Sequence, residues 1–269
     1  MRHFRVLGVR VDAVQIPDVV ALMQRWIAER ERSHAVAVTG MHGVSEAQRH
    51  PDFKRILNAA DLVVPDGMPL VWVGRLRGHA LRRRVYGPEL MLEFCARTRG
   101  GRYRHYFYGG APGVADRLAE TLANRFPGLN VVGTDCPPFR PLDASETAEA
   151  RRRIRDARPD VVWVGLSTPK QERWMHENRA HLDVPVLVGV GAAFDLNTGR
   201  VRQAPRWMRE HGLEWSWRLG QEPRRLWRRY LLNGPSFAWN VGLELAGLRR
   251  FDETPGAKPR RTLERSAGS

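Results

Sequence analysis

Cysteine is scarce in this 269-residue sequence, and the common metal-binding motifs are absent. The two cysteines, Cys95 and Cys136, lie far apart without the short spacing of a metal-binding pair. We interpret both as reduced thiols in a reducing compartment. The sequence contains no Asp-x-Asp, no His-x-Glu-x-x-His and no paired Cys-x-x-Cys, so it predicts no metal site.

Long apolar runs are also missing. The longest uninterrupted run of apolar residues and glycine is 184–194, which contains Pro185 and falls short of the ~20 residues that a membrane-spanning helix needs. Residues 1–6 lack the apolar region of a signal peptide. We therefore expect a protein that is soluble or attached peripherally to a membrane.

Acidic residues are too few to balance the basic ones. The chain has 29 Asp and Glu against 44 Lys and Arg, which gives a net charge of +15. Such an excess predicts an acidic partner: nucleic acid, anionic lipid or a phosphate-bearing substrate. Hydrophobic residues make up 42 % of the chain, enough for a sizeable core in one large domain or one domain with an extension.

Short Val-rich segments alternate with amphipathic segments over the first two thirds of the chain. The predicted strands are 35–38, 62–64, 103–108, 129–133, 160–164 and 184–190, after a small hairpin near the N-terminus. The predicted helices include 16–30, 44–50, 52–60, 114–126 and 144–157. This alternation is typical of an α/β fold with a doubly wound, mostly parallel, Rossmann-like sheet.

Polar residues occur in the turns that follow five of these strands. These turns, which combine glycine with polar groups, are marked by Thr39, Asp66, Gly109 with Gly110, Lys170 with Gln171, and Asp195. In a parallel sheet the carboxyl ends of the strands lie along one edge, where ligands bind. We therefore expect these turns to converge on one ligand site.

Asp66 is the strongest single candidate for chemistry. It lies in Pro65-Asp66-Gly67, where two breakers separate a short apolar strand from the start of a helix, so we expect it on a tight turn. A carboxylate there can act as a general base on a substrate hydroxyl. A role for Asp66 as a simple cap of the next helix fits the spacing equally well.

Two glycine-containing turns carry weaker signals. Gly109-Gly110-Ala-Pro-Gly113 would place backbone N–H groups beside a phosphate, although a plain turn fits as well. The segment 189–194 resembles the start of a dinucleotide fingerprint, but Phe194 stands in place of the third glycine. We therefore disfavour a nicotinamide or flavin enzyme and expect no cofactor.

The composition shifts near residue 199. Residues 200–230 contain nine arginines and three glutamates, interleaved with four tryptophans. This segment could bind nucleic acid, lie on an anionic membrane, or form a packed helix pair with a solvated basic face. Nucleic acid is disfavoured because the rest of the chain shows no nucleic-acid-binding module.

The composition divides the chain into three parts. We expect an α/β core over residues 1–198, a basic Arg/Trp-rich helical appendage over 199–250, and a disordered tail over 251–269.

Seven blocks of residues, in order and at compatible spacing, resemble the WecG/TagA/CpsF glycosyltransferases, glycosyltransferase family 26. The blocks are Asp61-Leu-Val-Val-Pro-Asp66-Gly-Met68, Arg84-Val-Tyr-Gly-Pro-Glu-Leu-Met91, Tyr108-Gly-Gly-Ala-Pro-Gly-Val114, Val164-Gly-Leu-Ser-Thr-Pro-Lys-Gln-Glu172, Gly189-Val-Gly-Ala-Ala-Phe-Asp195, Arg202-Gln-Ala-Pro-Arg-Trp-Met208, and Gly212-Leu-Glu-Trp215 through Gln221-Glu-Pro-Arg-Arg-Leu-Trp-Arg-Arg-Tyr230. The resemblance runs from about residue 5 to residue 245.

This resemblance implies a metal-independent, inverting transfer of a sugar from a UDP-sugar to a polyprenyl-diphosphate-linked saccharide, in exopolysaccharide or cell-envelope polysaccharide synthesis. It implies a peripheral enzyme at the cytoplasmic face of the membrane, in contact with the anionic membrane surface. It makes Asp66 the base. It makes Thr39, Arg84, Gln171 and Asp195 pocket residues, beside the turn at Gly109 and Gly110. Arg218, Arg225 and Arg228 match arginines of an appendage that closes over the diphosphate.

One departure concerns the residues Thr39-Gly-Met-His-Gly43. Met41 stands where the family usually has Asn, and this segment looks more like the branch that includes the xanthan-type glucosyltransferase GumM. The rival hypothesis is a non-catalytic basic protein that binds nucleic acid or anionic membrane, which would show no UDP-sugar turnover. The sequence leaves the oligomeric state open, a homo-oligomer included.

Overall fold

The computed structural model describes residues 1–227, residue 231 and residues 233–251. Residues 252–269, which make up nearly all of the predicted disordered tail, lie outside the described residues.

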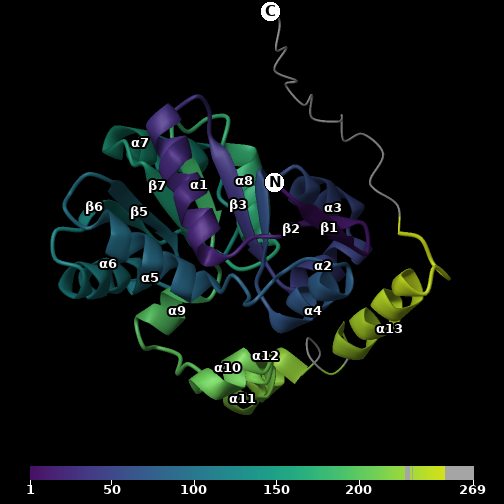
Figure 1. Ribbon diagram of the computed structural model, residues 1–269. Coiled ribbons are helices and arrows are strands. Elements are labelled where there is room, and N and C mark those ends of the chain that lie inside the picture. The colour runs from purple at the N-terminus through teal and green to yellow at the C-terminus, as the bar shows by residue number, and fades with distance from the viewer. Residues whose placement is uncertain (228–230, 232, 252–269) are drawn as a thin grey trace, which may run out of the picture.

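The centre of the fold is a six-stranded sheet (Figure 1). The strands are β3 (His34–Thr39), β4 (Leu62–Pro65), β5 (Arg104–Gly109), β6 (Asn130–Asp135), β7 (Val161–Gly165) and β8 (Val186–Gly189). Their order is β4-β3-β8-β7-β5-β6, and every neighbouring pair is parallel. The prediction of a doubly wound, mostly parallel α/β sheet is confirmed.

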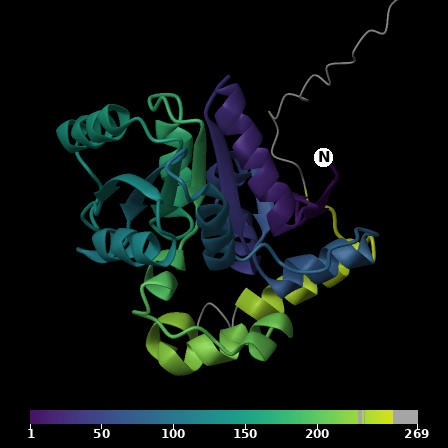
Figure 2. The same ribbon diagram turned by 60° about the vertical axis from the view of Figure 1, so that its left-hand side comes forward.

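Helices cover both faces of the sheet (Figures 1 and 2). One face carries α1 (Ile16–Glu29), α5 (Gly87–Thr98), α6 (Val114–Arg125) and the short α9 (Ala193–Asn197). The other carries α2 (Met41–Arg49), α3 (Pro51–Asn58), α4 (Met68–Leu76), α7 (Ala144–Ala157) and α8 (Lys170–Asn178). Because alternate residues of a strand point to opposite faces, Val36 and Val38 join one apolar cluster and Ala37 joins the other. Burial on both faces explains the Val-rich strands.

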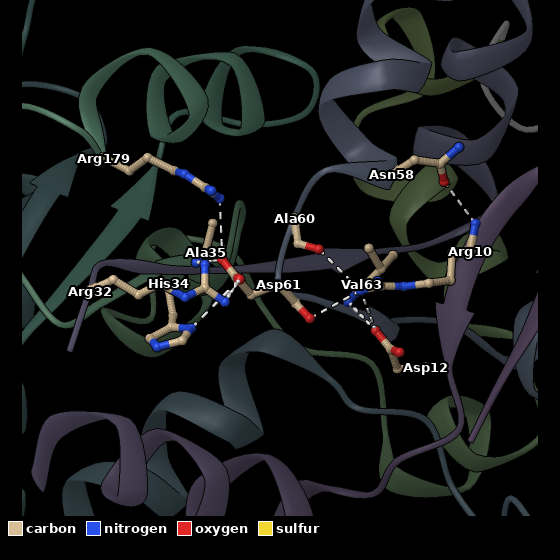
Figure 3. Close-up of polar contacts among 10 residues, drawn as sticks. All are labelled: Arg10, Asp12, Arg32, His34, Ala35, Asn58, Ala60, Asp61, Val63 and Arg179. Carbon is tan, nitrogen blue, oxygen red and sulfur yellow. Dashed lines mark hydrogen bonds and ion pairs between the residues drawn. The ribbon is translucent and has the colours of Figure 1, made fainter. Parts of the chain in front are cut away.

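The N-terminal hairpin is also confirmed. Strands β1 (His3–Val6) and β2 (Val9–Asp12) pair antiparallel and pack against the second face of the sheet. The carboxylate of Asp12 accepts hydrogen bonds from the N–H of Val63 at 2.8 Å and from the guanidinium of Arg10 at 3.0 Å (Figure 3). The hairpin is thereby joined to β4, one of the two edge strands of the sheet.

A second carboxylate, Asp61, lies just before β4 at the amino end of the strands (Figure 3). Its side chain is 2 % exposed and contacts the guanidinium groups of Arg32, at 2.7 Å, and Arg179, at 3.2 Å. This cluster ties the segment before β3 and the end of α8 to the start of β4. It lies at the opposite end of the sheet from the expected ligand edge.

Helix α2 begins at Met41, earlier than the predicted start at residue 44. The reason is that the N–H of Val44 already donates to the carbonyl of Gly40, so the glycine-containing stretch forms the first helical turn. The turn between β3 and α2 is correspondingly short, and it holds Met41 and His42 close to the carboxyl end of β3.

The C-terminal part of the chain is helical: α10 (Arg206–Glu210), α11 (Glu214–Gln221), α12 (Pro223–Trp227) and α13 (Asn233–Leu245). The first three lie below the carboxyl edge of the sheet in Figure 1, and α13 returns beside α2. Phe237 and Val241 of α13 are buried in the same apolar cluster as the hairpin and α2. Glu244 accepts a hydrogen bond from the N–H of Leu7 and pairs with Arg77 at 3.0 Å.

Within the described residues, no helix combines the length and the apolarity that crossing a membrane requires.

Candidate functional site

A cavity of about 510 Å³ lies at the carboxyl edge of the sheet. Its walls come from the turns after four neighbouring strands and the helix starts that follow them: 40–43 after β3, 66–69 after β4, 167, 168 and 171 after β7, and 190–192 after β8. Residues of α11 and the start of α13 complete it. Four of the five predicted turns therefore border this cavity, and the turn after β5 does not.

Asp66 lines this cavity from the turn after β4. Its N–H donates to the carbonyl of Thr39 at 2.8 Å, which aligns the turns after β3 and β4. Gly67 has φ +145°, a backbone conformation that side-chain-bearing residues rarely adopt, so the turn needs glycine there. Gly67 is also the N-cap of α4, so Asp66 lies one residue before the helix cap. The Pro-Asp-Gly turn thus places Asp66 in the wall of the cavity.

Arg84 reaches the cavity from the segment that leads into α5. Its guanidinium pairs with Glu214 of α11 and lies over the ring of Tyr86, 4.0 Å from the ring centroid. Burial by itself would lower the pKa of Arg84, but the nearby charges of Asp66 and Glu214 outweigh this effect and raise it. Arg84 therefore supplies a permanent positive charge beside Asp66.

Tyr86 is held in its neutral form. Burial, with the nearby charge of Glu214, raises the pKa of the phenol above its ordinary value of 10. Its hydroxyl donates to Glu214 at 3.1 Å. The phenol therefore acts as a hydrogen-bond donor at neutral pH.

Gln171 forms part of the cavity wall from the first turn of α8, and its side chain is almost fully buried. Its carbonyl oxygen accepts from the N–H of Gly191 at 2.9 Å, and its amide nitrogen donates to Glu172 at 3.1 Å. Thr168 also donates to Glu172, at 2.8 Å. Burial raises the pKa of Glu172. The network fixes Gln171 between the ends of β7 and β8.

Of the three predicted arginines in the C-terminal segment, the structure describes the side chain of one, Arg218. Arg218 of α11 lines the cavity. Arg225 lies on α12, but its side chain is outside the described residues, as is the whole of Arg228. Helix α11 ends at Gln221 and α12 begins at Pro223, so Arg218 and Arg225 belong to separate helices.

The remaining predicted residues are not among those that line the cavity. Thr39 is buried beneath the first turn of α2, where a Cβ on Gly43 would come within 2.0 Å of its hydroxyl. Gly109 ends β5 and Gly110 follows it, outside the four strands that border the cavity. Asp195 lies on α9, 3.7 Å from Arg200.

Several cavity residues were not singled out from the sequence. Tyr86, Ser167, Thr168 and Glu214 lie within the blocks that resemble the family but were not predicted as site residues, and Trp72 lies in none of the blocks. Arg84 and Glu214 are 130 positions apart, so no local spacing could relate them. Among the described residues, no group of three or more His, Cys, Asp and Glu is placed to hold a metal ion.

Comparison with known proteins identifies a family whose sequence model covers most of this chain. The sequence model described as "Glycosyl transferase WecG/TagA/CpsF family" matches residues 4–250.

Three relatives share one printed name, N-acetylglucosaminyldiphosphoundecaprenol N-acetyl-beta-D-mannosaminyltransferase. The protein of Bacillus spizizenii is 33 % identical over 186 residues, which cover 69 % of this chain and 70 % of the relative. That of Bacillus subtilis strain 168 is 28 % identical over 204 residues, 76 % of this chain and 77 % of the relative. That of Staphylococcus aureus strain MW2 is 24 % identical over 237 residues, 88 % of this chain and 91 % of the relative.

Proposed function

The chain belongs to the WecG/TagA/CpsF family of glycosyl transferases, and on this premise we propose that it moves a hexose from a UDP-sugar to a saccharide carried on a polyprenyl diphosphate. The relatives' name describes an acceptor in which N-acetylglucosamine is joined through a diphosphate to undecaprenol. We propose an acceptor of the same class for this chain, in exopolysaccharide or cell-envelope polysaccharide synthesis.

The observation that supports this proposal most directly is the arrangement of Asp66, Arg84 and Arg218 around one cavity. A transferase of this class needs a base for the acceptor hydroxyl and positive charge for the departing diphosphate. Asp66 offers the carboxylate. Arg84 and Arg218 offer guanidinium groups, which bind phosphate oxygens with favourable geometry.

The proposed reaction is a single displacement. Asp66 takes the proton from the acceptor hydroxyl while that oxygen forms a bond to the anomeric carbon of the donor. The bond between this carbon and the UDP oxygen breaks on the opposite side, and UDP leaves with the electron pair. The configuration at the anomeric carbon is therefore inverted. Arg84 and Arg218 stabilise the negative charge that develops on the diphosphate, which is why we propose a reaction without metal.

We further propose that the protein works at the cytoplasmic face of the membrane, with the C-terminal helices against the lipid. Trp207 of α10 and Trp239 of α13 have exposed fractions of 58 % and 70 %. Tryptophan is favoured at the membrane interface, and basic residues nearby are attracted to anionic headgroups. This placement would bring a lipid-linked acceptor to the cavity that α11 covers.

The test is a screen of UDP-sugars, UDP-glucose and UDP-N-acetylmannosamine among them, against polyprenyl-diphosphate-linked acceptors. Both donors belong in it because Met41, which cannot donate a hydrogen bond, lines the cavity at the family's usual Asn position. Mass spectrometry should show an acceptor heavier by one sugar residue. Binding of anionic liposomes or nucleic acid without turnover of any UDP-sugar would favour the rival hypothesis of a non-catalytic basic protein.

A further inference from the structure

We propose that Glu214 is a positioning residue: it holds the guanidinium of Arg84 in the cavity wall beside Asp66 and so makes the orientation of Arg84 depend on the packing of α11 against the core. This inference rests on the proposed function of the cavity. Glu214 is the first residue of α11, and Arg84 belongs to the α/β core.

The contacts around Glu214 fix Arg84 from two directions. One carboxylate oxygen of Glu214 pairs with Nη2 of Arg84, and the other accepts the hydroxyl of Tyr86 at 3.1 Å. The ring of Tyr86 in turn lies 4.0 Å from the guanidinium carbon. The edge of the guanidinium is therefore held by a carboxylate, and its face by an aromatic ring.

Burial distinguishes this ion pair from those on the surface. The side chains of Arg84 and Glu214 are only 15 % and 12 % exposed, and both line the cavity with Asp66. A buried ion pair is an inefficient source of stability, because removing two charges from water offsets most of their attraction. The buried Arg84–Glu214 pair is therefore better explained by the fixed orientation that it gives to the Arg84 guanidinium than by a contribution to stability.

A second ion pair also joins the C-terminal helices to the α/β core, and one of its two partners is exposed. Arg209 of α10 pairs with Glu89 of α5 at 2.6 Å, and the Glu89 side chain is 47 % exposed. Neither residue is among those that line the cavity. The guanidinium of Arg209 also lies 5.8 Å from the centroid of the Tyr86 ring, so the control is Glu89→Gln, which removes the exposed partner and leaves Arg209 in place.

The charge of Arg84 is shared between two carboxylates. Asp66 lines the same cavity as Arg84, Arg218 and Glu214, with His42 and Tyr86 also in its walls, and the charge of Asp66 acts on Arg84. If Glu214 loses its charge, the positive charge of Arg84 is balanced by Asp66 alone. The Asp66 carboxylate is then stabilised further, so it keeps its charge to lower pH and becomes a weaker base.

The test compares three full-length variants, Glu214→Gln, Glu214→Asp and Glu89→Gln, with the UDP-sugar and acceptor that wild type uses. For Glu214→Gln we expect kcat to fall by about 10- to 100-fold, because a misplaced group can cost about 10²-fold. The acidic limb of its kcat/KM profile should move to lower pH. Glu214→Asp should keep this limb at the wild-type pH, and Glu89→Gln should match wild type in both quantities.

A readout independent of turnover is amide hydrogen exchange in α11. Circular dichroism should show that Glu214→Gln is folded. Its α11 amides should then exchange faster than those of wild type or Glu89→Gln.

If Glu214→Gln does not fold, Tyr86→Phe takes its place. This variant removes only the hydroxyl that contacts Glu214, and it should show the same changes at smaller size. Unchanged kcat with a lower KM for the UDP-sugar would overturn the proposal, since Glu214 would then merely compete with substrate for Arg84. Unchanged exchange in α11 would also overturn it. Absence of turnover by wild type would instead contradict the proposed function.

Discussion

The carboxylate of Asp61 accepts a hydrogen bond of 2.9 Å from the N–H of Ala35, and this contact joins the amino ends of β3 and β4. Five residues later, at the other end of β4, Asp66 faces the cavity. One short strand thus has a structural carboxylate at its start and the candidate base at its end. Asp61 fixes the strand that carries Asp66.

We predict that Asp61→Asn destabilises the fold at neutral pH. Burial alone would raise the pKa of Asp61, but the Ala35 N–H and the charges of Arg32 and Arg179 hold it below its ordinary value. A lowered folded-state pKa contributes stability above the unfolded pKa of about 3.9, and this contribution is lost as pH falls through the folded pKa. At pH 7 the loss should be about 2 kcal/mol, the scale of a buried hydrogen bond to a charged group.

Urea unfolding of wild type and Asp61→Asn at pH 7 and pH 3 measures this prediction. The difference in unfolding free energy should shrink at pH 3. The control is Asp52→Asn, which removes the surface partner of Arg173 and should change stability little at either pH. A difference that grows on acidification would contradict the assignment of Asp61 as an ionised, stabilising carboxylate.

We predict that Asp66→Asn nearly abolishes sugar transfer while the fold is kept. The amide retains the size of the carboxylate but cannot accept the hydroxyl proton, and loss of a general base costs roughly 10²- to 10⁴-fold in rate. Turnover and circular dichroism should be measured together. The matched control is Asp183→Asn, an exposed carboxylate outside the cavity, which should transfer at the wild-type rate. A folded Asp66→Asn enzyme with normal turnover would remove Asp66 from the mechanism.

We predict that transfer survives excess EDTA. The physical reason is that Arg84 and Arg218 line the cavity and can stabilise the leaving diphosphate as cations. The measurement is the initial rate with and without chelator, followed by addition of Mg²⁺ or Mn²⁺. Loss of activity with EDTA that either metal restores would show that a metal ion takes part.

We predict that Trp207→Ala and Trp239→Ala each weaken binding to anionic liposomes. Both side chains are exposed, and about 50 Å² of apolar surface moved into lipid is worth roughly 1 kcal/mol, or about fivefold in affinity. Co-sedimentation with liposomes of increasing anionic lipid content provides the measurement. Phe139→Ala, an 80 % exposed aromatic in the loop between β6 and α7, is the control and should bind as wild type. Equal weakening by Phe139→Ala would argue against a specific membrane face.

The helical segment beyond residue 198 is less separate from the core than its composition alone indicates. Phe237 and Val241 of α13 are buried against the hairpin and α2, and Glu244 contacts Leu7 and Arg77. The division of the chain at residue 198 into a core and an appendage therefore stays a prediction. Composition reports charge and aromatic content, whereas docking depends on which side chains of α13 face an apolar surface on the core.

The candidate site was only partly predictable. The turns after β3, β4, β7 and β8 were all identified from the sequence, because a breaker after a buried strand is a local signal. The inclusion of Asp66 and Gln171 in one cavity follows from that signal together with the parallel sheet. The position of Gly109 and Gly110 depends on strand order: β7 lies between β5 and β8, so the turn after β5 falls beyond the cavity.

The positions of the strands and turns can be derived from local sequence. Burial on both faces selects Val-rich runs, and proline and glycine end them, so these features follow from neighbouring residues. The contacts of Glu214 with Arg84 and Tyr86 are instead set by tertiary packing. The same packing places Thr39 and Asp195 outside the cavity lining. Such pairings join residues far apart in the chain. They depend on the order of the strands and the docking of whole helices, which no local pattern records.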